Sequence, residues 1–168
     1  FPTLGSKHIK KRRIDGVEVE WISPTNDHER TIIYVHGGSF ALGSAQAYRQ
    51  HLVRLARLTN ARIVSIDYNL APEHPFPHAM NQVLKVWGRL CRQKDFHPSE
   101  TVVMGDSAGA NIILAAVLTL RDRAKPLPSC IVLLSAGLDA TFSGVSYDDN
   151  KDKDLILSPQ AIGFYMQS

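Results

Sequence analysis

Short apolar blocks alternate along the chain with longer amphipathic stretches. The blocks are rich in Val and Ile and show no regular polar alternation, which is the pattern of strands buried on both faces of a sheet. The stretches between them repeat apolar residues at three- and four-residue spacing, which indicates helices that pack by one face. The predicted strands cover residues 31–35, 62–66, 101–104 and 130–134. The predicted helices cover residues 48–58 and 79–91, and a third helix follows Gly105 and runs through residue 120.

The first part of the chain predicts a β-hairpin. Residues 7–13 and 17–22 flank the pair Asp15-Gly16, which is a preferred sequence for a two-residue turn between antiparallel strands. In the second arm apolar residues alternate with glutamates, as in a strand with one buried face. The hairpin therefore precedes the buried strands and differs from them in pattern.

Together these elements predict an α/β fold with a mostly parallel sheet and helices on both faces, entered through the antiparallel hairpin. The length of 168 residues suits one core, and no repeat or linker divides the chain, so residues 1–168 are expected to form one domain. Residues 143–154 are polar and predict a loop. Ser158-Pro159 then predicts the start of another helix, with Ser as its cap and Pro in its first position.

Composition and charge exclude several classes of function. The longest apolar stretch, residues 108–120, is shorter than the about 20 residues that a membrane-spanning helix needs. The net charge of +3 comes from five basic residues within residues 7–13, which leaves the rest of the chain at −2. A nucleic-acid footprint usually spreads over a face, so no nucleic-acid partner is expected. Cys91 and Cys130 lack disulfide or metal spacing, and we expect them to be buried free thiols of a cytoplasmic protein.

The strongest chemical signal is the segment Gly105-Asp106-Ser107-Ala108-Gly109. It matches G-x-S-x-G and lies between a predicted strand and a predicted helix, the position that this motif requires. The strand-to-helix turn is so tight that small residues must flank the serine. Such a turn lifts the Ser107 hydroxyl clear of the sheet and directs the following backbone N–H toward the same point. The pattern predicts Ser107 as a nucleophile, with Asp106 supporting the turn.

A second signal is the loop His36-Gly37-Gly38-Ser39-Phe40, which follows another predicted buried strand. A serine hydrolase needs backbone N–H donors at this place to stabilise the tetrahedral oxyanion, and glycines let the backbone approach the substrate oxygen. Taken alone, the loop could equally be an anion-binding turn or a structural turn. Its combination with the G-x-S-x-G segment favours the hydrolase interpretation.

At this point the sequence resembles the hormone-sensitive-lipase-like branch of the α/β-hydrolases, which includes bacterial carboxylesterases. Three motifs carry the resemblance, in family order and at family-like spacing. HGGSF at residues 36–40 is similar to HGGGF, DYNLAPEHPFP at residues 67–77 is similar to DYRLAPEHPFP, and GDSAGAN at residues 105–111 is similar to GDSAGGN.

The resemblance implies an α/β-hydrolase fold and a carboxylic ester hydrolase that forms an acyl-enzyme on short or medium acyl esters. It implies Ser107 as the nucleophile and the N–H groups of Gly37, Gly38 and Ala108 as the oxyanion hole. His36 is then expected to brace its loop rather than transfer protons. The family implies no cofactor and no metal, a small-molecule ester as the partner, and leaves a homodimer of the full-length protein open.

The general base of such an enzyme is missing from the sequence. In α/β-hydrolases the acid and the histidine follow the nucleophile, yet no histidine follows Ser107. Asp139 could be proposed as the acid, although the matching aspartate of the family is structural. We expect the chain to be the N-terminal portion of an enzyme, lacking the last strands and the cap that precedes residue 1. The alternative is a degenerate, non-catalytic homologue, such as a small-molecule receptor of the kind represented by the plant gibberellin receptors.

Two other sets of polar residues have spacings that resemble those of metal sites. His74 and His78 have a four-residue spacing, but the prolines between them exclude the helix that would direct both at one metal. The acidic run of residues 148–154 resembles a calcium loop, but it has Lys153 where the sharp turn requires Gly and Pro159 where a bidentate Glu is needed. No metal site is therefore predicted.

Overall fold

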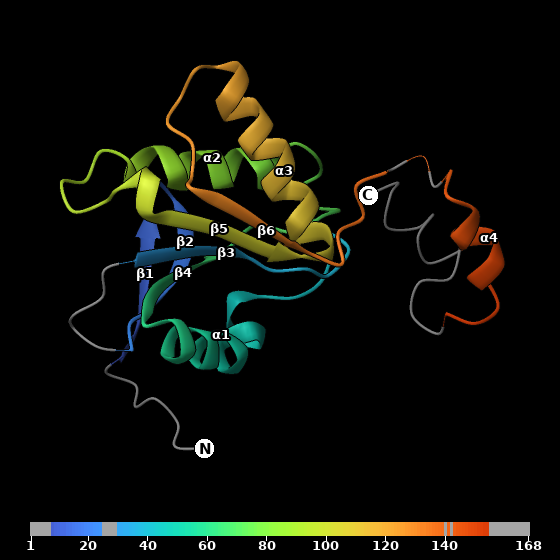
Figure 1. Cartoon of the computed structure of the whole chain (residues 1–168), viewed down its shortest axis with the longest axis horizontal. Coiled ribbons are helices and arrows are strands. Elements are labelled where there is room, and N and C mark those ends of the chain that lie inside the picture. Colours follow the sequence, from blue (N-terminus) through green and yellow to red (C-terminus); the bar gives the residue numbers. More distant parts are fainter. Residues whose placement is uncertain (1–7, 25–29, 140, 142, 155–168) are drawn as a thin grey trace.

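The computed structural model describes residues 8–24, 30–139, 141 and 143–154, and it shows one six-stranded sheet (Figure 1). The order across the sheet is β1-β2-β4-β3-β5-β6. β4, β3, β5 and β6 run parallel to one another, and β1 and β2 are antiparallel additions at one side. The strands are β1 (Ile9–Ile14), β2 (Val17–Ile22), β3 (Arg30–Val35), β4 (Ala61–Asp67), β5 (Thr101–Asp106) and β6 (Cys130–Leu134).

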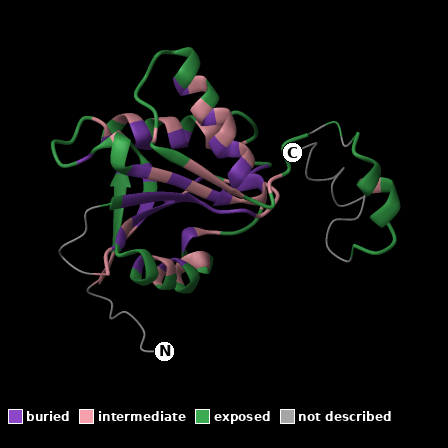
Figure 2. Ribbon diagram, viewed as in Figure 1, coloured by how far each residue is buried: buried purple, intermediate pink, exposed green. Residues whose placement is uncertain are grey.

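Helices cover both faces of this sheet, as the sequence predicted. α1 (Ala45–Thr59) lies on one face, whereas α2 (His78–Leu90) and α3 (Ser107–Asp122) lie side by side on the other (Figure 1). The short 3₁₀-helix η2 (Pro98–Glu100) precedes β5. Each face encloses its own apolar core, and Figure 2 shows the buried residues concentrated on the central strands. Within β3, Ile33 and Val35 pack toward α2 and α3, whereas Ile32 and Tyr34 pack toward α1.

The predicted hairpin is confirmed. Ile14 of β1 pairs with Val17 of β2, so Asp15 and Gly16 are the only residues of the turn. Both have positive φ, +46° and +86°, which is the backbone of a type I′ turn and explains why Asp-Gly occurs there. β1 forms the outer edge of the sheet, and its basic residues 10–13 are exposed. Charges along an edge strand oppose the addition of a further strand.

Three expectations were wrong. β6 is not buried on both faces, because its end residues are exposed and its middle residues are only partly buried. The two cysteines are not buried either: Cys130 is exposed and Cys91 is only half-buried. The polar stretch predicted as a loop contains a short helix, α4 (Val145–Asn150). The helix predicted at Ser158-Pro159 lies outside the described residues. Among the described helices, none is both long and apolar enough to cross a bilayer.

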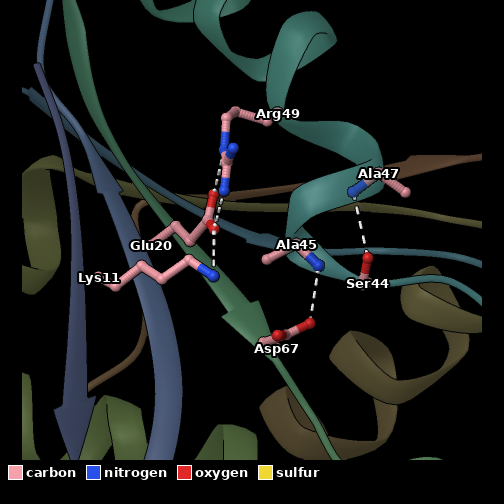
Figure 3. Close-up of polar contacts among 7 residues, drawn as sticks. All are labelled: Lys11, Glu20, Ser44, Ala45, Ala47, Arg49 and Asp67. Atoms are coloured by element: carbon pink, nitrogen blue, oxygen red, sulfur yellow. Dashed lines mark hydrogen bonds and ion pairs between the residues drawn. The ribbon is translucent and has the colours of Figure 1, made fainter. Parts of the chain in front are cut away.

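A buried ion pair fastens α1 to the antiparallel side of the sheet (Figure 3). The Glu20 side chain on β2 is nearly inaccessible, and the Arg49 guanidinium of α1 donates to both of its carboxylate oxygens, at 2.9 and 2.6 Å. The start of α1 is fixed separately. The Ser44 hydroxyl oxygen accepts from the Ala47 N–H at 3.1 Å, and Asp67 at the end of β4 accepts from the Ala45 N–H at 2.7 Å.

We expect Arg49→Leu to lower the free energy of unfolding of the complete natural protein that contains this sequence by about 2–3 kcal/mol, because Glu20 would remain buried without its bidentate partner. Urea unfolding at neutral pH measures the change. Lys11→Met is the matched control, since the exposed Lys11 ammonium lies 3.9 Å from Glu20 and should contribute less than about 1 kcal/mol. Equal losses in the two variants would contradict the assignment.

Candidate active site

The candidate site lies where the carboxyl ends of three neighbouring parallel strands meet. β3, β4 and β5 pair in parallel register, so the loops that follow Val35, Asp67 and Asp106 leave the sheet at the same edge. Ligand sites of open α/β sheets form at this edge. The three motifs of the sequence therefore converge, although 64 residues lie between the end of the first motif and the start of the last.

Ser107 lies at an abrupt change from strand to helix. β5 ends at Asp106 and α3 begins at Ser107, with no intervening loop. The φ angle of Ser107 is +48°, a left-handed conformation that residues other than glycine seldom adopt. This conformation is the one that the G-x-S-x-G pattern predicts for a nucleophile carried on a strained turn.

The glycines on either side of Ser107 allow the turn to pack against the end of β3. A Cβ atom added to Gly105 would lie 2.5 Å from the Val35 carbonyl oxygen, and one added to Gly109 would lie 2.2 Å from the same oxygen. Neither distance is compatible with a side chain. The two glycines are therefore required by the contact between the Ser107 turn and the β3 backbone.

The Ala108 N–H belongs to the first turn of α3. The first four N–H groups of an α-helix have no partner within the helix, and the partial positive charge of the helix end is concentrated there. The Asp106 side chain does not cap this end. The structure thus leaves Ala108 as a donor directly beside Ser107, the position that the sequence predicted for it.

The loop after β3 is folded into a compact turn, which we call the oxyanion loop (residues 36–44). The Gly38 carbonyl accepts from the N–H groups of Ala41 and Leu42, at 3.1 and 2.8 Å. Gly38, Ser39 and Phe40 all have positive φ, at +123°, +51° and +64°. This run of left-handed residues reverses the chain, so that the loop remains at the edge of the sheet beside the Ser107 turn.

Gly37 does not have the role predicted for it. Its N–H donates to Asp106 Oδ1 at 3.0 Å, so this donor is engaged within the protein and is removed from the predicted oxyanion set. By contrast, the N–H groups of Gly38 and Ser39 donate to no acceptor among the residues that the structure describes. Ser39 stands where the HGGGF motif has its third glycine. Its backbone donor could have been recognised, because an N–H does not depend on the side chain.

His36 is fully buried beneath the oxyanion loop. Its ring stacks on Tyr68 with a centroid separation of 4.3 Å, and its Nδ1 lies 2.8 Å from the Gly37 carbonyl oxygen. A carbonyl can only accept, so Nδ1 carries the proton. Burial lowers the pKa of His36, which favours the neutral ring. Nε2 has no hydrogen-bond partner among the described residues. These contacts are those of a residue that holds the loop.

The proline-rich loop that follows β4 supports the oxyanion loop from the other side. The Tyr68 hydroxyl donates to the His36 carbonyl at 2.9 Å, and the Ala71 N–H donates to the Phe40 carbonyl at 3.1 Å. The loop itself is closed by two reciprocal hydrogen bonds between Asn69 and Gln82 of α2. The segment 67–77 therefore contacts the backbone of the site.

The polar groups that imitate metal sites do not form one among the described residues. The His74 and His78 rings lie 4.5 Å apart, although no helix spans the two residues, since α2 begins at His78. Even so, no group of three or more His, Cys, Asp or Glu side chains assembles within the described ranges, the acidic run of residues 148–154 included.

Asp139 lies on the exposed segment after β6. Its carboxylate accepts hydrogen bonds from the hydroxyl and backbone N–H groups of both Thr141 and Ser143. These hydrogen bonds, with that from the Thr141 hydroxyl the strongest, lower the pKa of Asp139 to about 2. The Asp139 carboxylate is therefore engaged by Thr141 and Ser143, two neighbouring residues of its own segment.

Comparison with known proteins agrees with this geometry. Residues 32–168 match the family described as alpha/beta hydrolase fold, and the chain belongs to that family. The structure is similar to an esterase from the bacterial hormone-sensitive lipase family, with a TM-score of 0.90 and 30% identity over 99% of this chain, and to the homologue EstE7, with a TM-score of 0.90 and 28% identity. The resemblance drawn from the three motifs is thereby confirmed.

The curated relatives include an esterase and an acetyl-hydrolase. The sequence is 35% identical to an esterase of Acinetobacter venetianus over 96% of this chain, and 35% identical to an acetyl-hydrolase of Streptomyces hygroscopicus over 82% of it. The chain spans about half the length of these proteins, 53% and 46%, and 56% of the solved hormone-sensitive-lipase-family esterase. The described sheet therefore corresponds to part of the esterase fold.

We expect Gly109→Ala to destabilise the complete natural protein by at least about 2 kcal/mol, because the new Cβ would overlap the Val35 carbonyl. Gly88→Ala is the matched control. Gly88 lies inside α2 with no atom within 4 Å of an added Cβ, so the same substitution should stabilise by up to about 1 kcal/mol through helix propensity. Chemical denaturation of both variants measures the contrast, and a neutral Gly109→Ala would contradict the packing argument.

Proposed function

We propose that the protein containing this sequence hydrolyses carboxylic esters, with Ser107 as the nucleophile. The observation that carries this proposal is the left-handed Ser107 at the β5–α3 junction. It lies beside the oxyanion loop and beside the Ala108 N–H, which donates to no described residue. The esterase relatives support the same reaction class. Anionic intermediates are stabilised by donors that are already oriented, and two sets of such donors converge here.

In the proposed reaction, Ser107 Oγ attacks the ester carbonyl carbon while a general base takes the hydroxyl proton. The carbonyl oxygen becomes an oxyanion, which the N–H groups of Gly38, Ser39 and Ala108 would stabilise. Collapse of this intermediate releases the alcohol and leaves an acyl-enzyme. Water then attacks the acyl carbon by the same route and releases the acid.

The general base lies outside this chain in the proposed mechanism. No histidine follows Ser107, and His36 is buried with Nδ1 held by the Gly37 carbonyl. The relatives are nearly twice as long as the matched region, which leaves room for a base and an acid on further strands. The proposed substrates are short or medium acyl esters, since one relative is named an acetyl-hydrolase.

We expect Ser107→Ala in the complete natural protein to lower kcat on a p-nitrophenyl acyl ester by at least about 10³-fold, as the removal of a triad nucleophile does. Alanine at φ +48° has nearly the same backbone strain as serine, so the fold should be retained and circular dichroism should be unchanged. An unaltered rate in the folded variant would refute the nucleophile and favour the receptor alternative.

Residues 1–168 expressed alone should not hydrolyse esters, because no base follows Ser107. They should also self-associate, since no described strand pairs with the outer edge of β6 and Leu134 and Leu138 are exposed near it. The measurements are p-nitrophenyl butyrate hydrolysis against buffer and light scattering. A monomeric chain with the kcat of the complete protein would show that the base lies within these residues.

A further inference from the structure

We propose that Asp106 is a positioning residue for the oxyanion loop, holding the Gly37 N–H while Tyr34 and Tyr48 hold the Asp106 carboxylate in place. This inference rests on the proposed esterase function, because it assigns a purpose to the loop in that reaction. It concerns three side chains that do not touch substrate in the proposed mechanism. Two of them, the tyrosines, belong to none of the motifs recognised in the sequence.

The Asp106 carboxylate receives three donors from two elements and one loop. Oδ1 accepts from the Tyr34 hydroxyl of β3 at 2.9 Å and from the Gly37 N–H of the oxyanion loop at 3.0 Å. Oδ2 accepts from the Tyr48 hydroxyl of α1 at 2.8 Å. Tyr34 is almost completely buried, and Asp106 and Tyr48 are partly buried. The side chain that precedes the nucleophile is thus directed at the neighbouring loop.

The carboxylate also explains why residue 37 is a glycine. A Cβ atom at this position would lie 2.4 Å from Asp106 Oδ2 and 2.9 Å from the Asp106 carbonyl oxygen. A side chain would therefore displace Asp106 or the loop. The first glycine of the motif is therefore required by the approach of Asp106.

These contacts fix two successive peptide planes. The first is the peptide between His36 and Gly37, whose carbonyl accepts from the Tyr68 hydroxyl and whose N–H donates to Asp106. The second is the peptide between Gly37 and Gly38, whose carbonyl accepts from His36 Nδ1. A trans peptide is planar, with its N–H directed opposite to its C=O. The Gly38 N–H is therefore forced to point away from the buried His36 ring, as an oxyanion donor must.

The two tyrosine donors stay protonated over the range in which esterases are assayed. Burial is the main cause that raises the pKa of Tyr48 to about 12, and burial raises the pKa of Tyr34 further. In both cases the hydrogen bond to Asp106 adds to the effect. Neither hydroxyl ionises near neutral pH, so the hydrogen bonds to Asp106 persist there.

The test compares Tyr48→Phe, Tyr34→Phe and Asp106→Asn in the complete natural protein. Each phenylalanine removes one hydroxyl from the Asp106 carboxylate, and we expect kcat to fall about 5- to 10-fold with KM changed less than 2-fold. Asp106→Asn keeps only one acceptor oxygen, and we expect a fall of more than about 10-fold. Thr59→Val is the matched control, because it removes a hydroxyl that donates to the Leu55 carbonyl at the far end of α1 and should leave kcat unchanged.

A second measurement needs no activity. Hydrogen–deuterium exchange of the peptide covering residues 36–43 should be faster in Asp106→Asn and Tyr48→Phe than in the wild type, while peptides from α2 exchange as before. The inference would be overturned if these variants changed neither the exchange of peptide 36–43 nor kcat. It would also be overturned if they lowered the melting temperature but left kcat per folded molecule the same. If Ser107→Ala also leaves hydrolysis intact, the proposed function fails, and exchange alone then decides whether Asp106 holds the loop.

Discussion

The whole site depends on the close approach of two backbones, the end of β3 and the turn that carries Ser107. The Val35 carbonyl occupies the space in which a Cβ of Gly105 or Gly109 would otherwise lie. This approach requires β3 and β5 to be neighbours in the sheet, which brings residues far apart in sequence into contact. Once the strands are paired, the oxyanion loop leaves β3 beside Ser107. The geometry of the candidate site is therefore a consequence of strand order.

The two cores then keep the strands in place from both sides. Tyr34 belongs to both the core and the candidate site. Its ring packs in the core beneath α1, and its hydroxyl donates to Asp106. The α1 helix is tied to the sheet by the Glu20–Arg49 pair and by Asp67 at its first turn. A change in the seating of α1 would move Tyr48 as well. The contacts that hold α1 on the sheet therefore also determine where Tyr48 lies relative to Asp106.

The sequence predicted most of the fold because its signals were local. Apolar blocks and helical periodicity located the strands and helices, and Asp15-Gly16 located the hairpin turn. The position of Ser107 also followed from local pattern, since G-x-S-x-G demands a strand before it and a helix after it. One failure was local, since the polar stretch predicted as a loop contains the short helix α4. The other failures concerned contacts between distant residues. The engagement of the Gly37 N–H by Asp106 spans 69 positions, and the exposure of Cys130 depends on which strands flank β6.

The two sides of the described sheet differ in character. At one side the exposed basic residues of β1 face outward, and Arg13 is already paired with Glu18 of its own hairpin. At the other side β6 presents Val and Leu residues and an exposed thiol. The exposed charges of β1 oppose the addition of a strand at that edge, whereas β6 carries no charged residue. Any further strand of this sheet would therefore pair with β6 and not with β1.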